Sequence, residues 1–118
     1  MKSIPLRQAA YLLDIFRSVG AIQSYAAGQT YEEFLKDTKT QDAVLRRFLV
    51  AGEAAARPSP ETCSEFPHIP FPKIVGMGNR VVHDYGNVDF GIVWETIQTH
   101  LPLEFKELHG FFSERGEA

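Results

Sequence analysis

The 118-residue sequence is poor in cysteine and has no long apolar run. Its single thiol, Cys63, excludes an intrachain disulfide and a metal cluster held by cysteines. No stretch approaches the roughly 20 apolar residues that span a membrane. Arg7 and Asp14 interrupt the N-terminal region in which a secretory signal would need its apolar segment. We therefore expect a cytoplasmic protein without a membrane span.

Positive charge is also scarce. The chain carries 12 Lys and Arg against 15 Asp and Glu, which gives a net charge of -3. A polyanion such as RNA would therefore have to be held by a local basic cluster against a mildly repulsive background. The only adjacent basic pair is Arg46-Arg47. It is typical of a solvated helix face, and RNA contact is the alternative.

Recognisable metal and cofactor motifs are missing as well. None of the four histidines has the two-histidine helical spacing of a zinc protease, so we expect no metal. Gly76-Met77-Gly78 lacks the third glycine and the preceding strand of a dinucleotide-binding loop, and we expect no cofactor. No nucleophile elbow is present, although a Ser/His/Asp or Cys/His arrangement formed by distant residues stays open.

Strand alternation is absent, and helical periodicity takes its place. Apolar residues make up 44% of the chain, enough for the core of one domain over residues 1–118. Residues 6–25 show apolar positions at spacings of three and four and should form a helix that ends before Gly28. Thr30 and Glu33 form a capping-box pattern at the start of a short helix.

The remaining helices follow from similar signals. A long helix should run from about Thr40 to Pro58, and its small residues 52–56 would let another helix backbone come close. Ser59-Pro60 starts a short helix, residues 71–85 form another, and Asp89 caps the last one, which Pro102 kinks or restarts. The sequence thus predicts an all-α, up-down helical bundle of four main helices plus one or two short ones.

The densest group of reactive side chains lies at the end of the helix predicted over residues 71–85. Asn79, Arg80, His83 and Tyr85 fall within seven residues. An imidazole with a pKa near neutrality is the usual general acid or base, and a helix C-terminus favours its protonated form. Arg80 lies three residues before His83, on the same helical face. Catalysis is one reading of this group, and a structural histidine beside a turn is the other.

At these residues the chain resembles the HEPN superfamily, specifically the HepT toxins of HepT/MntA toxin–antitoxin pairs. The resemblance runs nearly end to end, and its combination of motifs is more specific than any one of them. The matching segments are Thr40-Gln41-Asp42-Ala43-Val44, Gly52-Glu53-Ala54-Ala55, Gly76-Met77, Asn79-Arg80, His83-x-Tyr85, Val88-Asp89, Ile92-Val93-Trp94-Glu95-Thr96 and Leu101-Pro102.

The resemblance implies a metal-independent RNase in a homodimer that brings two motifs to a shared cleft. His83 matches the catalytic histidine and Asn79 the polar residue of the family motif. The family's catalytic arginine falls on position 78, where this chain has Gly78. Arg80 could replace it, because position 78 lies about 140° from His83 on an ideal helix. We follow the family pattern and expect impaired cleavage, with Gly78 arising either by natural loss or by a substitution that silences a toxin.

The same resemblance implies a partner and a substrate. The partner is an MntA-like nucleotidyltransferase antitoxin that transfers AMP to the motif tyrosine, here Tyr85. The substrate is tRNA, cut near its 3′ end. Apart from the resemblance, Arg80, Arg46 and Arg47 are candidate RNA contacts because of their charge. The alternative function is a non-catalytic HEPN homodimer that binds RNA or the nucleotidyltransferase.

Overall fold

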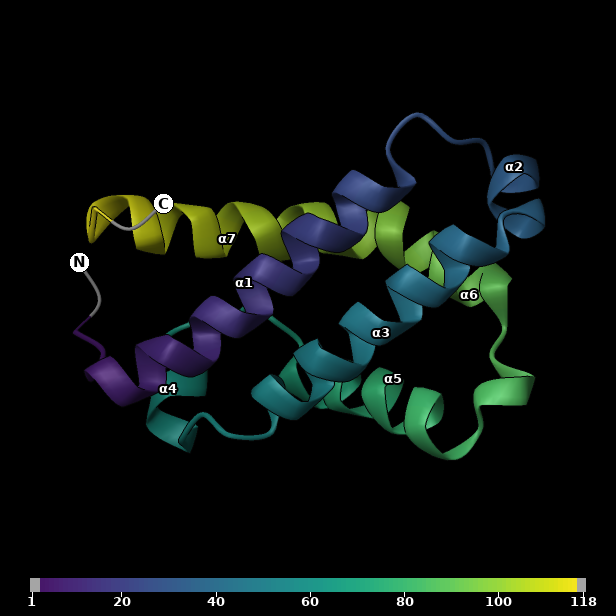
Figure 1. Cartoon of the computed structure of the whole chain (residues 1–118). Coiled ribbons are helices and arrows are strands. Elements are labelled where there is room, and N and C mark those ends of the chain that lie inside the picture. The colour runs from purple at the N-terminus through teal and green to yellow at the C-terminus, as the bar shows by residue number, and fades with distance from the viewer. Residues whose placement is uncertain (1–2, 117–118) are drawn as a thin grey trace.

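The computed structural model describes residues 3–116, and that part of the chain contains helices and no strand. Four long helices form its frame: α1 (Leu6–Ala26), α3 (Thr38–Ala55), α5 (Phe71–His83) and α7 (Leu101–Glu114). Figure 1 shows α1 and α3 crossing the front of the molecule, with α7 and α5 behind them. The predicted all-α bundle of four main helices is confirmed.

The connection between α1 and the next helix is formed as its local sequence predicts. α1 ends where Gly28 adopts a φ of 79°, a conformation that glycine reaches without strain. The short helix α2 (Tyr31–Lys36) begins with the predicted capping box. The Glu33 amide donates to the Thr30 hydroxyl at 3.1 Å, and the Thr30 amide donates to the Glu33 carboxylate at 2.8 Å. Two amides that the helix leaves without partners are thereby satisfied.

The third helix begins slightly before the predicted Thr40. The Asp37 carboxylate accepts from the Thr40 amide at 3.0 Å and caps α3, which therefore starts at Thr38. After α3, Ser59 caps the short helix α4 (Pro60–Ser64) as its sequence predicted. Two more short elements follow α5: a 3-10 helix at Tyr85–Asn87 and the helix α6 (Phe90–Glu95).

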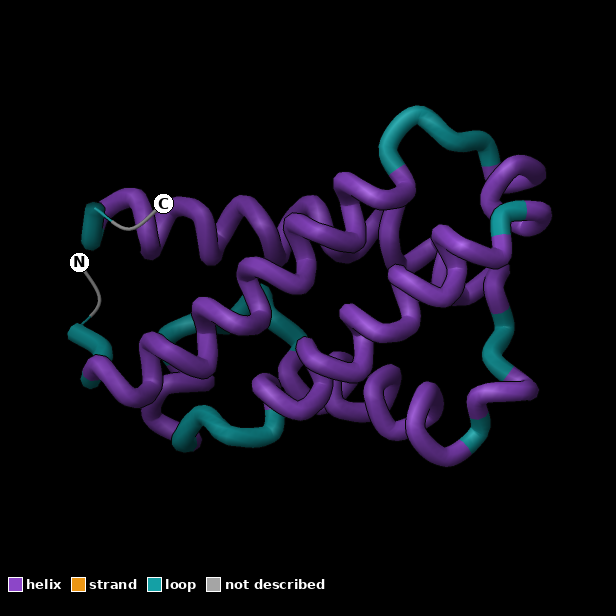
Figure 2. Tube along the Cα trace, viewed as in Figure 1, coloured by secondary structure: helices purple, strands orange, loops and turns teal. Residues whose placement is uncertain are grey.

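The segment predicted as one last helix is interrupted. Asp89 accepts from the amides of Gly91 and Ile92 and caps α6, as predicted. Five residues in π-helical conformation, Thr96–His100, then lead into α7, whose first turn contains Pro102. The break near Pro102 is therefore a π-helical segment that joins two α-helices. Figure 2 accordingly shows helix without an intervening loop from α6 into α7.

The long helices pack in the order α7, α1, α3, α5. α1 packs on both α3 and α7, and α3 packs on α5, whereas α5 has no extensive contact with α6 or α7. The core lies mainly between these layers, and its largest fully buried side chains are Phe34, Phe66, Phe112, Leu12, Ile15, Ile22, Leu45 and Leu108. One side of the bundle consequently stays open between α5 and the α6–α7 segment. Within the described residues, no helix has the length and apolarity needed to span a membrane.

Candidate functional site

His83 is the last residue of α5, and its side chain is exposed. Asn79 and Arg80 lie about one turn earlier on the same helix, and both are exposed as well. The Asp84 amide donates to the Arg80 carbonyl at 2.8 Å, and the helix ends there. His83 therefore sits at the exposed end of the helix, where its imidazole is in contact with solvent, as an acid–base group acting on a large substrate requires.

Tyr85 follows His83 closely and is tied to α3. Its hydroxyl donates a hydrogen bond of 2.6 Å to the Asp42 carboxylate, 43 residues earlier in the chain. This hydrogen bond, together with desolvation and the negative charge of Asp42, raises the pKa of the Tyr85 phenol. The phenol is thus held in its neutral form beside the end of α5, although its side chain is 54% exposed.

Gly78 has a role in packing that the sequence only partly predicted. It is buried, and a Cβ atom added to it would lie 2.9 Å from the Gly52 Cα and 3.3 Å from the Phe48 carbonyl oxygen. A Cβ added to Gly52 would likewise lie 2.8 Å from the Gly78 Cα. The prediction that the small residues 52–56 admit another helix is confirmed, and that helix is α5. Any larger residue at position 78 would have to move α3 away from α5.

The position of Gly78 bears on the arginine that the family resemblance placed there. The glycine faces α3, while His83 faces solvent, in accord with the helix geometry that separates the two positions. Gly78 and Asn79 also line a shallow depression of about 310 Å³, together with Glu53 and Arg57. A cation is therefore available beside Gly78, although it belongs to the segment that follows α3.

The other predicted basic residues lie on separate surfaces. Arg80 lines a groove on a different side of α5 from the Gly78 depression. Arg46 and Arg47 line a third depression beside Tyr25 of α1. In residues 3–116, no group of three or more His, Cys, Asp or Glu side chains is arranged to hold a metal ion.

Sequence reasoning missed several residues around this site. Asp42 contacts Tyr85 through the fold alone, so no local pattern announces it. Arg57 and Glu53 join Gly78 because α3 and α5 pack side by side. Lys73 lies seven residues before Arg80 on α5, a spacing that places both on one helical face and could have been recognised.

Comparison with known proteins gives a consistent result. The model of one protein family, described as ribonuclease HepT-like, matches residues 15–109. A Methanocaldococcus jannaschii protein named as a candidate RNase is 32% identical over 108 residues, which cover 92% of this chain and 93% of that protein. A second such protein from the same organism is 35% identical over 98 residues, 83% of this chain and 81% of the relative. The "Probable ribonuclease HepT" of Thermococcus cleftensis is 32% identical over 92 residues, 78% and 84% of the two chains. No solved structure matches the chain.

Proposed function

The chain belongs to the HepT-like ribonuclease family, and from this premise we propose that it acts on tRNA as a metal-independent RNase. The observation that carries the proposal is the exposed His83 at the end of α5, with Asn79 one turn before it and Tyr85 just after it. The side chains around this histidine leave it open to a large substrate. The relatives named as RNases support the nuclease class, while the tRNA substrate is part of our proposal.

The proposed reaction uses the RNA's own 2′-hydroxyl as nucleophile. A general base removes the 2′ proton, the 2′ oxygen bonds to the adjacent phosphorus, the bond from phosphorus to the 5′ oxygen breaks, and a general acid protonates that oxygen. The products carry a 2′,3′-cyclic phosphate and a 5′-hydroxyl. The general base must start unprotonated and the general acid protonated, and one histidine cannot be in both states. We therefore propose a homodimer in which two copies of His83 share the two roles.

Charge stabilisation is the weak part of this site. The phosphoryl group gains negative charge in the transition state, and a positioned guanidinium stabilises it best. With Gly78 at the family's arginine position, we propose that this form cleaves slowly. Loss of one such stabilising group typically lowers the rate about a hundred- to a thousand-fold. Arg57, in the depression beside Gly78, is the cation placed to offset part of that loss.

We also propose that the protein is the toxin of a toxin–antitoxin pair, controlled by an MntA-like nucleotidyltransferase. Tyr85 would accept AMP from that partner, and the added phosphate would repel the RNA backbone beside His83. The phenol is exposed, which such a modification requires. Its hydrogen bond to Asp42 has to open before the oxygen can attack a nucleotide.

The direct test is cleavage of tRNA by the purified protein in the presence of a chelator. We expect slow cleavage with cyclic-phosphate ends, lost in His83→Ala and retained in the control His68→Ala, whose histidine is also exposed but lies outside the motif. Gly78→Arg should raise the rate if α3 moves enough to admit the new side chain, since its Cβ would otherwise meet the Gly52 backbone. A cooperative urea unfolding transition would show that the variant tolerates this movement. Equal activity of His83→Ala and the native protein would refute the proposal.

The second candidate function is a non-catalytic homodimer that binds RNA or the nucleotidyltransferase. The glycine at the family's arginine position favours it over catalysis, because position 78 itself supplies no guanidinium. It predicts that tRNA is retained without being cut, and that retention weakens steeply with added salt because the bound phosphates release counterions. Cleavage that depends on His83 would exclude this alternative.

A further inference from the structure

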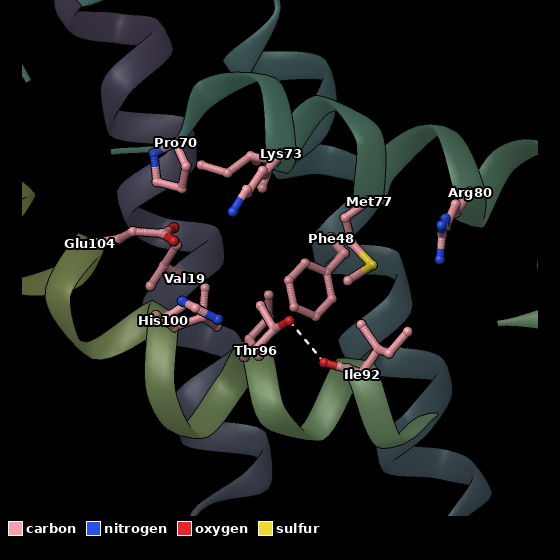
Figure 3. Close-up of a pocket in the computed structure, with 14 residues that line it drawn as sticks. Val19, Phe48, Pro70, Lys73, Met77, Arg80, Ile92, Thr96, His100 and Glu104 are labelled. Atoms are coloured by element: carbon pink, nitrogen blue, oxygen red, sulfur yellow. Dashed lines mark hydrogen bonds between the residues drawn. The ribbon is translucent and has the colours of Figure 1, made fainter. Parts of the chain in front are cut away.

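A groove of about 380 Å³ opens on the side of the bundle where α5 does not contact α6 and α7. Its floor is apolar and comes from α1 and α3, with Val19, Ile22, Phe48 and Ala51. Figure 3 shows that α5 forms one wall and that the α6–α7 segment forms the other. A volume of this size is typical of a small-ligand pocket.

The α5 wall is cationic at both ends and apolar in the middle. Lys73, Met77 and Arg80 line the groove at spacings of four and three residues, so they share one face of the helix. The helical rise places Arg80 about 10 Å from Lys73 along the axis and about 4.5 Å from His83. One end of the groove therefore lies next to the residue that we propose as acid and base.

The opposite wall supplies a buried carboxyl group without a hydrogen bond. Glu104 on α7 is only 3% exposed, and its Oε1 atom has no partner among the described residues. Thr96 and His100, which belong to the π-helical segment, line the same wall. In Figure 3, Glu104 and His100 lie together at one end of the groove and Arg80 lies at the other, with Phe48 and Met77 between them.

We infer that this groove binds one unpaired nucleotide of the RNA substrate, with its phosphate at Arg80 and its base against Met77 and the groove floor at Phe48. The inference rests on the function proposed above, since it places this nucleotide beside the phosphate that His83 acts on. The order of the groups matches the order within a nucleotide, in which a charged phosphate is followed by a flat ring and then by a polar base edge. Bases splayed out of single-stranded RNA are held by stacking and by hydrogen bonds to their edges.

Glu104 determines which base the groove prefers. An unpaired carboxyl oxygen in an apolar surrounding gains most from a hydrogen-bond donor. Burial raises the pKa of Glu104 to about 7. Above that pH the carboxylate only accepts hydrogen bonds, whereas the neutral acid can also donate one. The exocyclic amino group of cytosine provides a donor, whereas uracil has a carbonyl oxygen at the same ring position. The groove should therefore favour cytosine over uracil.

The test compares short 2′-O-methyl oligonucleotides of cytosine and uracil, which lack the nucleophilic hydroxyl and cannot be cut. Their binding to the native protein is measured by fluorescence anisotropy at one salt concentration and at a pH above 7, where the Glu104 carboxylate is charged. We expect the cytosine oligomer to bind about five- to thirty-fold more tightly, the factor that one hydrogen bond to a buried polar group provides. Glu104→Gln should abolish or reverse this preference, because an amide can donate to the uracil carbonyl.

Glu107→Gln is the matched control. Glu107 lies one turn along α7, also has a buried oxygen without a partner, and lines a different depression. We expect this variant to keep the cytosine preference of the native protein. Equal binding of the two oligomers, no binding of either, or a preference that survives Glu104→Gln would overturn the inference.

The outcomes separate this inference from the proposed catalysis. A cytosine preference that depends on Glu104, in a protein that leaves tRNA uncut, would support the groove and refute the RNase. Cleavage that depends on His83, without a base preference, would support the RNase and refute the groove.

Discussion

Replacing Glu104 by glutamine should stabilise the protein, and by an amount that depends on pH. The native side chain is 3% exposed, and burial raises the pKa of its carboxyl group from 4.5 to about 7. The folded protein therefore resists the ionisation that the unfolded chain permits. Glutamine has nearly the same size and stays neutral at every pH, so it removes this difference.

The magnitude follows from the shift in pKa. Raising the pKa from 4.5 to about 7 corresponds to roughly 3 kcal/mol of free energy of unfolding. The free energy of unfolding keeps this contribution below pH 4.5, loses it as the pH rises to about 7, and stays constant above that value. Glutamine should therefore stabilise the protein by about 3 kcal/mol at pH 8 and by less than about 1 kcal/mol at pH 5.

Urea unfolding at a series of pH values measures this effect. Trp94 is the only tryptophan, and its ring centroid lies 5.3 Å from that of Phe34, so its fluorescence should report the loss of packing. All other titrating groups cancel in the difference between the two proteins as long as they keep their surroundings. Glu104→Leu should show the same pH dependence. A difference in stability that does not change between pH 5 and pH 8 would refute the assignment of Glu104 as a buried, unpaired acid.

Two further predictions concern the contacts of α5 and its end. Gly78→Ala should lower the free energy of unfolding by about 1–3 kcal/mol, because its Cβ would meet the Gly52 backbone. A Cβ added at Gly76 has no atom within 4 Å, so Gly76→Ala should raise the free energy of unfolding by about 0.5–1 kcal/mol. Urea unfolding measures both, and equal effects would contradict the close helix crossing. Asp42→Asn should lower the pKa of the Tyr85 phenol, since the carboxylate that holds its proton is gone. Ultraviolet titration measures this pKa, and Tyr85→Phe identifies which part of the signal comes from Tyr85. The same phenol pKa in Asp42→Asn and in the native protein would contradict the hydrogen bond.

Local signals account for most of the correct predictions about the fold. The capping box at Thr30 and the cap at Asp89 each depend on side chains that bond to amides two or three residues away, so the sequence displays them directly. The small residues from Gly52 onward predicted a close helix approach for a similar reason, since the space they leave is a property of the residues themselves. The identity of the approaching helix required the fold.

The functional residues were predictable to different degrees. His83, Asn79 and Tyr85 form a pattern within seven residues and were found, and their catalytic and regulatory roles stay predictions. The contact between Tyr85 and Asp42 spans 43 residues, beyond the reach of any local pattern. No local pattern distinguishes Glu104 from the exposed polar residues of α7. Its burial depends on the rotation of α7 about its own axis. The apolar periodicity around Pro102 does not determine that rotation.

The π-helical segment Thr96–His100 sets the rotation of α7 about its axis. A π-helix bonds each amide one residue further back than an α-helix does, so such a segment accommodates an additional residue between two α-helices. Each residue of an α-helix corresponds to a rotation of about 100°. Deleting a single residue from Thr96–His100 would let the segment close into regular α-helix, and α7 would then be rotated by about that angle relative to α6. The number of residues in this short segment thus sets the rotation of α7 about its axis. An in-frame deletion of one codon would turn Glu104 away from the groove without changing the sequence of α7.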